Sequence, residues 1–532
     1  MATLWLVLGV IAGLFLYVRA NDAKLKRTPP EAMSFSPQRW TEDAVRRTAD
    51  RLADSPRSLL TVDQLPKQTG RRYIITGGAG FLGGWMVLHL LARGEDPRRI
   101  RVIDIRMPAR KDLTEGAAKD VDYILVDVTD AKAVDAAFSK PWPSAQSDVP
   151  GAPEPEVTVF HTAATIRFFE RHPDLLRHSN EVNVRGTENV VNAARRVGVS
   201  TLVSTSSGSI CVWNNRFWLW PWEKEPKYFV QPVNDDSSIP KRHEDYFSNY
   251  AASKHTAEKF VRAADKTPSG QRVLRTGCIR PGNGIYGPGG DLMVGNYLTR
   301  KTNPSWIQTM IQSLIYAENC SLAHLCYEAR LIELQQGSKN PDIGGQAFCV
   351  ADAGPPPLYG EVYDAVTQVS KGQTEFMYLS FTAMLALAQL VEWYYLARYF
   401  LLQSRFAFLG RIMPPVTGDI VFLQPSMWAL TGIHLWFNDS RARLAPEKGG
   451  LGYNGDITTM EGVCKSVIEH QRDGGKSLQR VIAGHKEVGH GFAPNRAENG
   501  PARIIAAVEN GPAKIIEKVE SGIAIHAANG HN

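Results

Sequence analysis

Tyr250 and Lys254 are the residues best suited to acid–base chemistry, because they lie four apart at the start of a helical pattern. Residues at this spacing share one face of a helix, so the ammonium of Lys254 can lie beside the phenol of Tyr250. A phenol with a pKa of about 10 is a poor base at neutral pH. A neighbouring cation, together with the positive nicotinamide ring of an oxidised dinucleotide, would favour the phenolate. Ser207, or its neighbour Ser206, ends a strand-like stretch and can hold a substrate oxygen near the phenol.

A glycine-rich turn earlier in the chain has the spacing of a phosphate-binding loop. A strand-like stretch leads into Gly77, Gly80 and Gly83, and a helical pattern follows. Such a turn lets the backbone approach a pyrophosphate, whose charge rests on amides at the helix N-terminus. Asp104 ends the next strand-like stretch, 21 residues after Gly83, where its carboxylate can accept hydrogen bonds from an adenosine ribose. Asp104 would repel a 2'-phosphate and therefore favours NAD over NADP, whereas Arg106 keeps NADP as the alternative.

Alternating strand-like and helical stretches must position these groups. This alternation predicts an α/β fold with a Rossmann-like, doubly wound parallel sheet over residues 71–281. From residue 282 the pattern loosens, and we expect a smaller, helix-rich substrate lobe at 282–474. The tail at 475–532 carries two copies of an 11-residue unit that match at eight positions, and it is expected to be a flexible appendage. The strand-like runs are 71–78, 99–105, 122–128, 157–164 and 201–207.

The first residues predict a membrane anchor. Residues 2–18 carry no charge and would span about 26 Å as a helix, close to the ~27 Å hydrocarbon core of an endoplasmic reticulum bilayer. A cleaved signal peptide is the alternative, but no basic residue precedes the run, and Arg19 stands where small cleavage-site residues are expected. Basic residues follow the run, so the positive-inside rule places the remaining chain in the cytosol. We expect a single-pass anchor at 1–19 and a polar linker at 20–70 that contains an amphipathic helix at 41–54.

Two further segments have the composition of membrane or apolar-ligand contacts. Residues 376–391 form a second charge-free run, which is short for a membrane span. We expect 376–411 to lie in the membrane interface, with a fully buried helix as the alternative. Residues 213–229 are rich in tryptophan, which suits a belt at the level of the lipid headgroups or an aromatic lid over an apolar ligand. The tryptophans of this second segment are Trp213, Trp218, Trp220 and Trp222.

Composition limits the classes of function. The 532 residues are 43% hydrophobic and 21% charged, which excludes a disordered or collagen-like chain. The mean hydropathy of -0.23 excludes a polytopic membrane protein. The net charge of +6 is too small over this length to indicate a nucleic-acid partner. The six scattered cysteines indicate a reducing compartment, and the thirteen histidines lack the spacing of metal ligands, so no metal site is expected.

Taken together, the motifs cover about residues 71–470. They comprise residues 76–83, Asp104, Asp127 with Val128, 161–164, 183–187, Ser206 with Ser207, Tyr250 with Lys254, and 280–289. This set resembles the extended short-chain dehydrogenases and, within them, the branch of 3β-hydroxysteroid dehydrogenases and sterol-4α-carboxylate 3-dehydrogenases. The chain departs from that pattern in two places. Ser207 and Tyr250 are separated by 42 residues, more than the family commonly has, and the tail after residue 474 has no counterpart.

The resemblance implies a role for each matching residue. Tyr250, Lys254 and Ser207 would be catalytic, with Tyr250 and Lys254 also touching the cofactor. Asp127 and Val128 would contact the adenine, Ala163 and Ala164 would line the cofactor cleft, Asn183 would support the active-site helix, and Pro281 would lie near the nicotinamide. The remaining dinucleotide contacts would come from Gly77, Gly80, Phe81, Leu82, Gly83 and Asp104.

The resemblance also implies an activity. We expect an NAD-dependent dehydrogenase of the endoplasmic reticulum membrane that oxidises a 3β-hydroxyl on a lipophilic sterol or triterpenoid. Where the substrate carries a 4α-carboxylate, its loss would complete a C-4 demethylation step. The alternatives are a dehydrogenase/isomerase or ketone reductase of specialised metabolism, a nucleotide-sugar epimerase, and a dinucleotide-binding scaffold without turnover. A homodimer, or association with other sterol-pathway enzymes, stays open.

Overall fold

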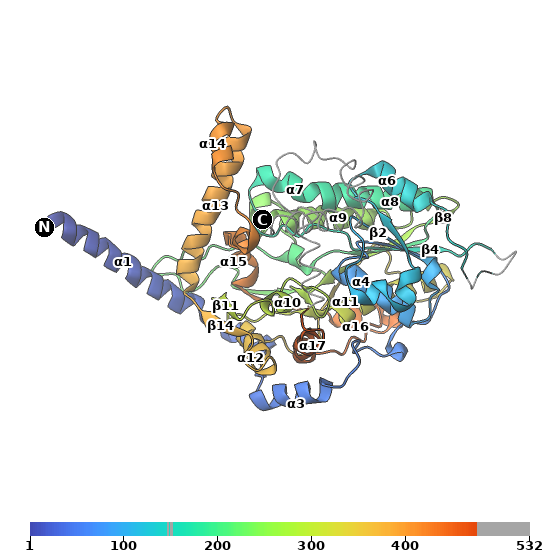
Figure 1. Ribbon diagram of the computed structural model, residues 1–532, viewed down its shortest axis with the longest axis horizontal. Coiled ribbons are helices and arrows are strands. Elements are labelled where there is room, and N and C mark those ends of the chain that lie inside the picture. Colours follow the sequence, from blue (N-terminus) through green and yellow to red (C-terminus); the bar gives the residue numbers. More distant parts are fainter. Residues whose placement is uncertain (146–147, 149–152, 476–532) are drawn as a thin grey trace, which may run out of the picture. The chain divides into compact units, whose positions relative to one another are not determined.

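One parallel sheet of seven strands is the centre of the part of the chain that the computed structural model describes, residues 1–145, 148 and 153–475 (Figure 1). The strands lie in the order β13-β9-β5-β4-β1-β2-β3. The order reverses between β1 and β4, and ligands of doubly wound sheets bind outside the carboxyl ends of the strands at such a point. The Rossmann-like fold predicted from the sequence is therefore confirmed. The strands are β1 (Arg72–Thr76), β2 (Ile100–Asp104), β3 (Asp122–Leu125), β4 (Val157–His161), β5 (Thr201–Thr205), β9 (Arg275–Pro281) and β13 (Ala347–Val350).

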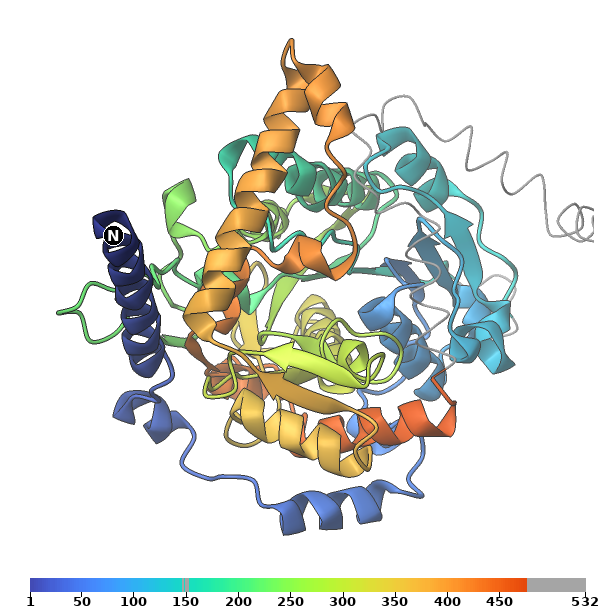
Figure 2. The same ribbon diagram turned by 60° about the vertical axis from the view of Figure 1, so that its left-hand side comes forward.

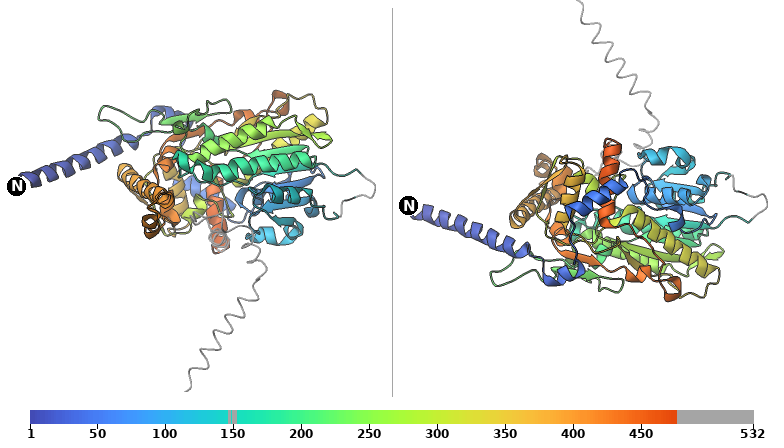
Figure 3. Two further views of the ribbon diagram at one scale, coloured as in Figure 1. Left: turned by 90° about the horizontal axis from the view of Figure 1, so that it is seen from above. Right: turned by 90° about the horizontal axis from the view of Figure 1, so that it is seen from below.

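Helices cover both faces of this sheet (Figures 1 and 3). Helices α4 (Phe81–Ala92) and α11 (Ala317–Gln335) pack together on one face. Helices α6 (Ala131–Ser139), α8 (Thr187–Arg196) and α9 (Asn249–Ala263) lie on the other. Double coverage explains why the central strands are apolar along their whole length rather than at alternate positions. Residues 72–76, 100–104 and 157–161 are buried almost throughout.

The sheet draws on both of the segments that the sequence separates at residue 281. Strand β13 and helix α11 come from 282–474, yet β13 pairs in parallel with β9 and α11 packs on β5 and β9. The rest of this segment forms a set of helices and short strands, which pair in parallel with one another or, for β15, with a strand at 230–233. The strands are β6 (Val230–Val233) with β15 (His434–Phe437), β10 (Ile285–Tyr286) with β12 (Ile315–Tyr316), and β11 (Thr302–Ser305) with β14 (Glu375–Tyr378). The helices are α10 (Val294–Tyr297), α12 (Tyr359–Val369), α13 (Phe381–Gln403), α14 (Ala407–Ile412), α15 (Pro425–Thr431), α16 (Ser440–Arg443) and α17 (Thr459–Arg472).

The polar segment before the sheet is packed against the body of the protein. The amphipathic helix predicted at 41–54 is α3 (Glu42–Leu52), whose first turn is capped by the Thr41 hydroxyl. Its apolar face packs on α12 and α17. After α3, the buried carboxylate of Glu318 accepts the backbone amides of residues 59 and 60 and so holds the chain on α11. The predicted repeat at 498–519 lies outside the described residues.

The first helix, α1 (Ala2–Leu25), is followed by the short helix α2 (Pro30–Phe35). In the described part of the chain, residues 2–35 are the one helical stretch that is long and apolar enough to cross a membrane. The apolar side chains of its first four turns are exposed, whereas Asn21 and Leu25 are buried against the body. Figures 1 and 3 show that the N-terminal turns of α1 stand clear of the other elements.

The second apolar run is not a single helix. Residues 375–378 form β14, and α13 begins only at Phe381, where the Ser380 hydroxyl caps its first turn. Helix α13 runs to Gln403, and α14 folds back on it (Figures 1 and 2). One face of α13 is buried and the other exposes large apolar side chains, so the alternative of a fully buried helix is wrong. The exposed residues include Leu387, Leu390, Trp393 and Phe400.

Candidate active site

The glycine loop follows β1 and leaves no room for side chains. Gly77 has a φ of +76°, and a Cβ at this position would lie 2.8 Å from the backbone nitrogen of Ala163. A Cβ at Gly83 would lie 2.5 Å from the carbonyl oxygen of Gly77. Helix α4 begins directly after Gly80, a residue with no side chain to cap it. The amides of its first turn are thus available to an anion, as the dinucleotide fingerprint requires.

Asp104 lies at the end of β2, against this loop. Its Oδ2 accepts the backbone N–H of Ala79 at 3.1 Å, and its Oδ1 accepts that of Arg106 at 3.3 Å. Burial raises the pKa of Asp104, while the Arg106 guanidinium and these amides oppose the rise. The carboxylate therefore stands where a ribose hydroxyl beside the loop would meet it.

The second group of predicted residues meets at the ends of β5 and α9. Ser207 follows β5, and its hydroxyl lies close enough to the phenol of Tyr250 to affect the pKa of that phenol. The Ser209 hydroxyl lies 2.7 Å from that of Ser207 and fixes it from the other side. Burial raises the pKa of Tyr250, and the hydrogen bond from Ser207 opposes the rise. The expectation of a lowered phenol pKa thus does not hold for the chain alone, because one of the two cations invoked belongs to the dinucleotide.

Lys254 lies one helical turn after Tyr250 and is buried. Its Nζ donates to the carbonyl oxygen of Thr205 at 2.6 Å, which places the ammonium at the end of β5. Burial lowers the pKa of Lys254 to about 8. The Lys254 charge also acts on His161 at the end of β4. Burial, and to a smaller extent this charge, lower the pKa of His161 to about 3. The Lys254 ammonium and the glycine loop consequently both lie near the carboxyl ends of β4 and β1.

Asn183 connects the segment after β4 with the catalytic helix. It lies in a π-helical turn, Glu181–Gly186, which joins α7 (Leu176–Asn180) to α8. Its amide donates to Ser253 Oγ at 2.9 Å, and its Oδ1 accepts the N–H of Thr165 at 2.9 Å. Ser253 in turn donates to the carbonyl oxygen of Tyr250 at 2.8 Å. The structure thus places Asn183 where it can support the active-site helix.

A buried ion pair that was not predicted from the sequence lies one turn beyond Lys254 on α9. Arg280 of β9 donates to both carboxylate oxygens of Glu258, at 2.6 and 2.9 Å, and both side chains are buried. Ser206 donates to the same carboxylate at 2.6 Å, so it is turned away from Tyr250, and Ser207 is the serine that faces the phenol. The available signal was Glu258, four residues after Lys254 on α9, together with an arginine inside an apolar strand.

The remaining predicted contacts are distributed around these two groups. Phe81 and Leu82 form the first turn of α4, and Ala164 is exposed beyond β4. Val128 packs on the π-helical turn, where a Cβ at Gly186 would lie 2.8 Å from Val128 Cγ2. The remaining two are Asp127, half-buried beside Val128, and Pro281, buried at the end of β9. Their assignments to the adenine and the nicotinamide stay predictions.

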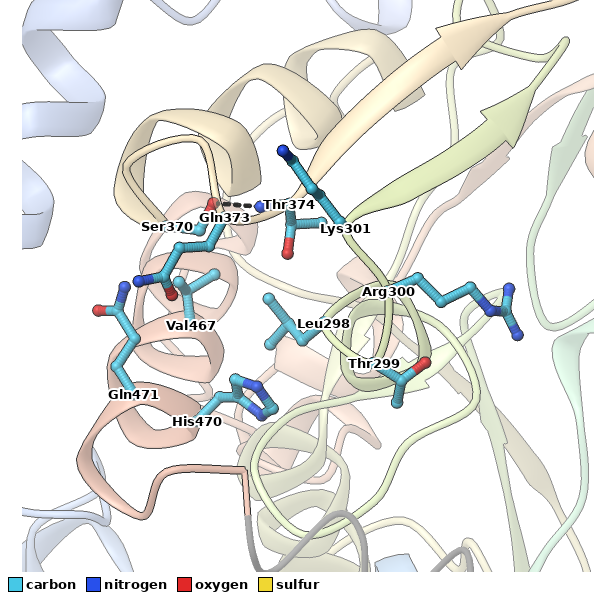
Figure 4. A pocket seen from close by; sticks show the side chains of 10 residues that line it. All are labelled: Leu298, Thr299, Arg300, Lys301, Ser370, Gln373, Thr374, Val467, His470 and Gln471. Atoms are coloured by element: carbon cyan, nitrogen blue, oxygen red, sulfur yellow. Dashed lines mark hydrogen bonds between the residues drawn. The ribbon is translucent and has the colours of Figure 1, made fainter.

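A separate hollow of about 250 Å³ lies between α17, the residues after α10 and the turn that joins α12 to β14 (Figure 4). Its lining is mostly polar, and Arg300 extends away from it toward its ion-pair partner Asp419. It contains none of the predicted site residues, and a polar lining is unsuited to a large apolar ligand. The lining residues are Leu298, Thr299, Arg300, Lys301, Ser370, Gln373, Thr374, Val467, His470 and Gln471.

The geometry around the glycine loop fits a dinucleotide. The cradle that Cβ atoms at positions 77 and 83 would fill, the open first turn of α4 and the carboxylate of Asp104 match the pyrophosphate and ribose. Beside them, the serine–phenol–ammonium arrangement can bind an alcohol oxygen and move its proton. A bound nicotinamide supplies the hydride chemistry. The arrangement can therefore oxidise an alcohol or reduce a ketone.

Comparisons with known proteins identify relatives of this chain. "3beta-hydroxysteroid-dehydrogenase/decarboxylase isoform 2" of Arabidopsis thaliana is 26% identical over 79% of this chain and 67% of that protein. The "3 beta-hydroxysteroid dehydrogenase/Delta 5-->4-isomerase" of Mycobacterium tuberculosis is 30% identical over 53% of this chain and 65% of that protein. Among solved structures, Bordetella bronchiseptica WbmG in complex with NAD and UDP aligns over 77% of this chain and 97% of its own, with 16% identity and a TM-score of 0.47. A sequence model matches residues 74–371, more than half of the chain. The chain belongs to the family that this model describes, the 3-beta hydroxysteroid dehydrogenase/isomerase family.

Proposed function

We propose that this protein is a membrane-anchored, NAD-dependent dehydrogenase that oxidises the 3β-hydroxyl of a sterol or triterpenoid. The observation that carries the proposal is the placement of Tyr250 and Lys254 one turn apart on α9, with Ser207 at the end of β5 and the glycine loop at the end of β1. Asp104 supports NAD rather than NADP, since its carboxylate would repel a 2'-phosphate. The apolar helix α1 supports a membrane location, and the basic residues that follow it support a cytosolic active site in the endoplasmic reticulum.

In the proposed mechanism, Ser207 donates a hydrogen bond to the substrate oxygen and holds it against the phenolate of Tyr250. Tyr250 takes the hydroxyl proton, and a bound nicotinamide would supply the acceptor for the hydride on C3, so that the alcohol becomes a ketone. Lys254 lies one turn away, where its charge favours the phenolate and its N–H groups can bind a ribose hydroxyl. Without this charge, a smaller fraction of Tyr250, whose pKa burial raises, would be present as the phenolate at neutral pH.

A substrate with a 4α-carboxylate would become a β-keto acid in this step. The bond from C4 to the carboxylate then breaks, carbon dioxide leaves and the electron pair forms an enolate. Ser207 and the protonated Tyr250 can donate hydrogen bonds to the enolate oxygen, and a proton from Tyr250 restores the ketone. The Arabidopsis relative named as a decarboxylase supports this version. The mycobacterial relative named as an isomerase supports the second candidate, oxidation without loss of carbon.

The test uses the full-length protein in detergent, with NAD and matched 3β-hydroxysterols that do or do not carry a 4α-carboxylate. NADH formation, carbon dioxide release and product masses are measured together. Carbon dioxide released only from the carboxylated substrate distinguishes the decarboxylating reaction from a simple dehydrogenase or an isomerase. Turnover of nucleotide sugars without any sterol turnover would favour the epimerase alternative, and binding of NAD without turnover of either would favour the scaffold.

Tyr250→Phe tests the assignment of roles. It removes the proton acceptor, so kcat should fall by about 10²–10⁴-fold, while the Kd for NAD stays close to that of the wild type. Tyr246→Phe is the matched control, because the Tyr246 hydroxyl meets the His255 ring rather than Ser207. Near-normal kcat in Tyr250→Phe would show that another group moves the proton.

A further inference from the structure

The residues 213–229, here called the tryptophan loop, have side chains that alternate between the body and the solvent. Phe217 and Leu219 are buried in the apolar cluster that also contains Phe381 and Trp428. Between and after them, Trp218 is 36% exposed, Trp220 58% and Trp222 76%. The three tryptophans are therefore turned away from the protein. A lid over an apolar ligand would need the opposite orientation, with its aromatic rings toward the body.

The loop has a fixed conformation despite its exposed tip. The Asn215 side chain closes the neck, since its Oδ1 accepts the N–H of Tyr228 at 2.9 Å and its amide donates back to the Tyr228 carbonyl. At the tip, Glu223 accepts the N–H of Trp220 at 2.6 Å. The rings of Trp220 and Trp222 stack in parallel, with centroids 5.4 Å apart. Exposed indoles held this rigidly form a preformed apolar surface rather than a collapsed loop.

The tryptophan loop is attached to the last turns of α1 (Figures 2 and 3). The side chain of Asn21 on α1 makes two hydrogen bonds to the backbone of the loop. Its amide donates to the Phe217 carbonyl at 3.0 Å, and its Oδ1 accepts the N–H of Leu219 at 3.3 Å. Tyr17 donates to the Leu219 carbonyl at 3.1 Å. The ammonium of Lys24 donates to the carbonyls of residues 220 and 221, at 3.1 and 2.9 Å. The loop and the base of α1 therefore form one unit.

The position of this attachment along α1 identifies what the tryptophans face. The loop contacts α1 between Tyr17 and Lys24, where the uncharged run at residues 2–18 ends and the charged residues begin. The ring of Tyr17 also stacks with that of Trp218, with centroids 6.4 Å apart. Tryptophan and tyrosine concentrate at this depth in membrane proteins, because their rings are apolar and their N–H or O–H groups are polar.

We infer that the tryptophan loop inserts into the headgroup layer of the bilayer that α1 crosses, with Trp218, Trp220 and Trp222 as the contact residues. The loop then fixes the height and tilt of the body above the membrane, which a single helix followed by a flexible linker would not do. The inference rests on α1 as a membrane helix and is independent of the proposed reaction.

The experiment measures the depth of the loop in vesicles of phosphatidylcholine and phosphatidylserine that contain the full-length protein. Trp222→Cys is labelled with the fluorophore NBD. The label should go to this position because the six native cysteines are all buried. On reconstitution we expect the NBD emission to shift to the blue and quenching by iodide to be lost. Lipids that carry a spin label near the headgroup should quench the emission strongly. Val273→Cys in β8 (Arg272–Val273) is the matched control, since Val273 is 51% exposed and lies at the far end of the molecule from α1 (Figure 1). Its label should stay in water.

A second pair of variants tests whether the indoles cause the insertion. The label is moved to Lys224→Cys, an exposed position in the same loop, with and without Trp220→Ala and Trp222→Ala. The blue shift should be lost in the variant without the indoles, although α1 still holds the protein in the vesicles. Iodide quenching at position 222 equal to that at 273 would overturn the inference. Protection at 222 that appears only when a sterol is added would overturn it in favour of a lid.

Discussion

The substitution Gly83→Ala tests the cofactor cradle directly. A Cβ at position 83 would lie 2.5 Å from the Gly77 carbonyl oxygen and 2.8 Å from Gly78 Cα. Both are backbone atoms and cannot rotate out of the way, so α4 and the glycine loop must separate. The separation moves the first-turn amides of α4 away from a bound pyrophosphate. A hydrogen bond to a charged group contributes about 1.5–3 kcal/mol, so loss of one such bond raises the Kd for NAD by about 10- to 100-fold.

The assay is a titration of the full-length protein with NAD and NADH by calorimetry or NADH fluorescence. Gly13→Ala is the matched control, since Gly13 is also a helical glycine, but its Cβ would meet nothing within 4 Å. The Kd of Gly13→Ala for NAD should equal that of the wild type. Thermal unfolding without dinucleotide shows how far the clash destabilises the fold itself, which overpacking does by about 1–3 kcal/mol. A folded Gly83→Ala protein that binds NAD with the wild-type Kd would refute the cradle.

Three further outcomes concern single side chains in the site and in the core. Glu258→Leu leaves Arg280 without its carboxylate partner and should lower the free energy of unfolding by about 3–5 kcal/mol. Glu258→Gln retains a hydrogen-bond acceptor and should lower it less, and urea unfolding measures both. Ser207→Ala should lower kcat up to about tenfold, the effect of one neutral hydrogen bond, with unchanged NAD affinity, and a larger change in NAD affinity than in kcat would contradict its role. Burial raises the pKa of Asp352 to about 6, so its protonated form stabilises the fold at low pH and this contribution is lost as the pH rises through 6. Relative to Asp352→Asn, the wild type should lose about 2 kcal/mol of unfolding free energy between pH 4 and pH 7. Parallel pH curves for the two proteins would contradict this.

Local patterns in the sequence predicted the elements whose cause is local. The glycine loop, the strand that ends at Asp104 and the helix capped by Thr41 each depend on residues adjacent in the chain. The start of α13 was not predictable from the uniformly apolar run 376–391. What divides that run is the pairing of β14 with β11, more than 70 residues earlier.

Contacts between distant segments were likewise beyond the sequence. The composition of the short run at 347–350 fits a strand or a helix segment equally well. It is a strand because it pairs with β9 at the edge of the sheet. The ion pair of Glu258 with Arg280 and the docking of the tryptophan loop on Asn21 also join residues far apart in the chain. In each case the residue types were visible, but the partner was set by the packing of the whole protein.

Helices α13 and α9 both contact the buried residue Glu170, and this limits how the predicted membrane contact of α13 can be tested. Glu170 accepts the Tyr395 hydroxyl of α13 at 2.7 Å, and its carbonyl accepts the N–H of Asn249, the residue before Tyr250, at 2.8 Å. Truncation of α13 would remove a partner of Glu170 at the point where the chain enters α9, so lost activity would not distinguish membrane contact from a displaced Tyr250. Substitutions on the opposite, exposed face, at Leu390 and Trp393, leave Glu170 intact. A change in membrane partition without a change in kcat on a detergent-dispersed substrate would then belong to the surface of α13 alone.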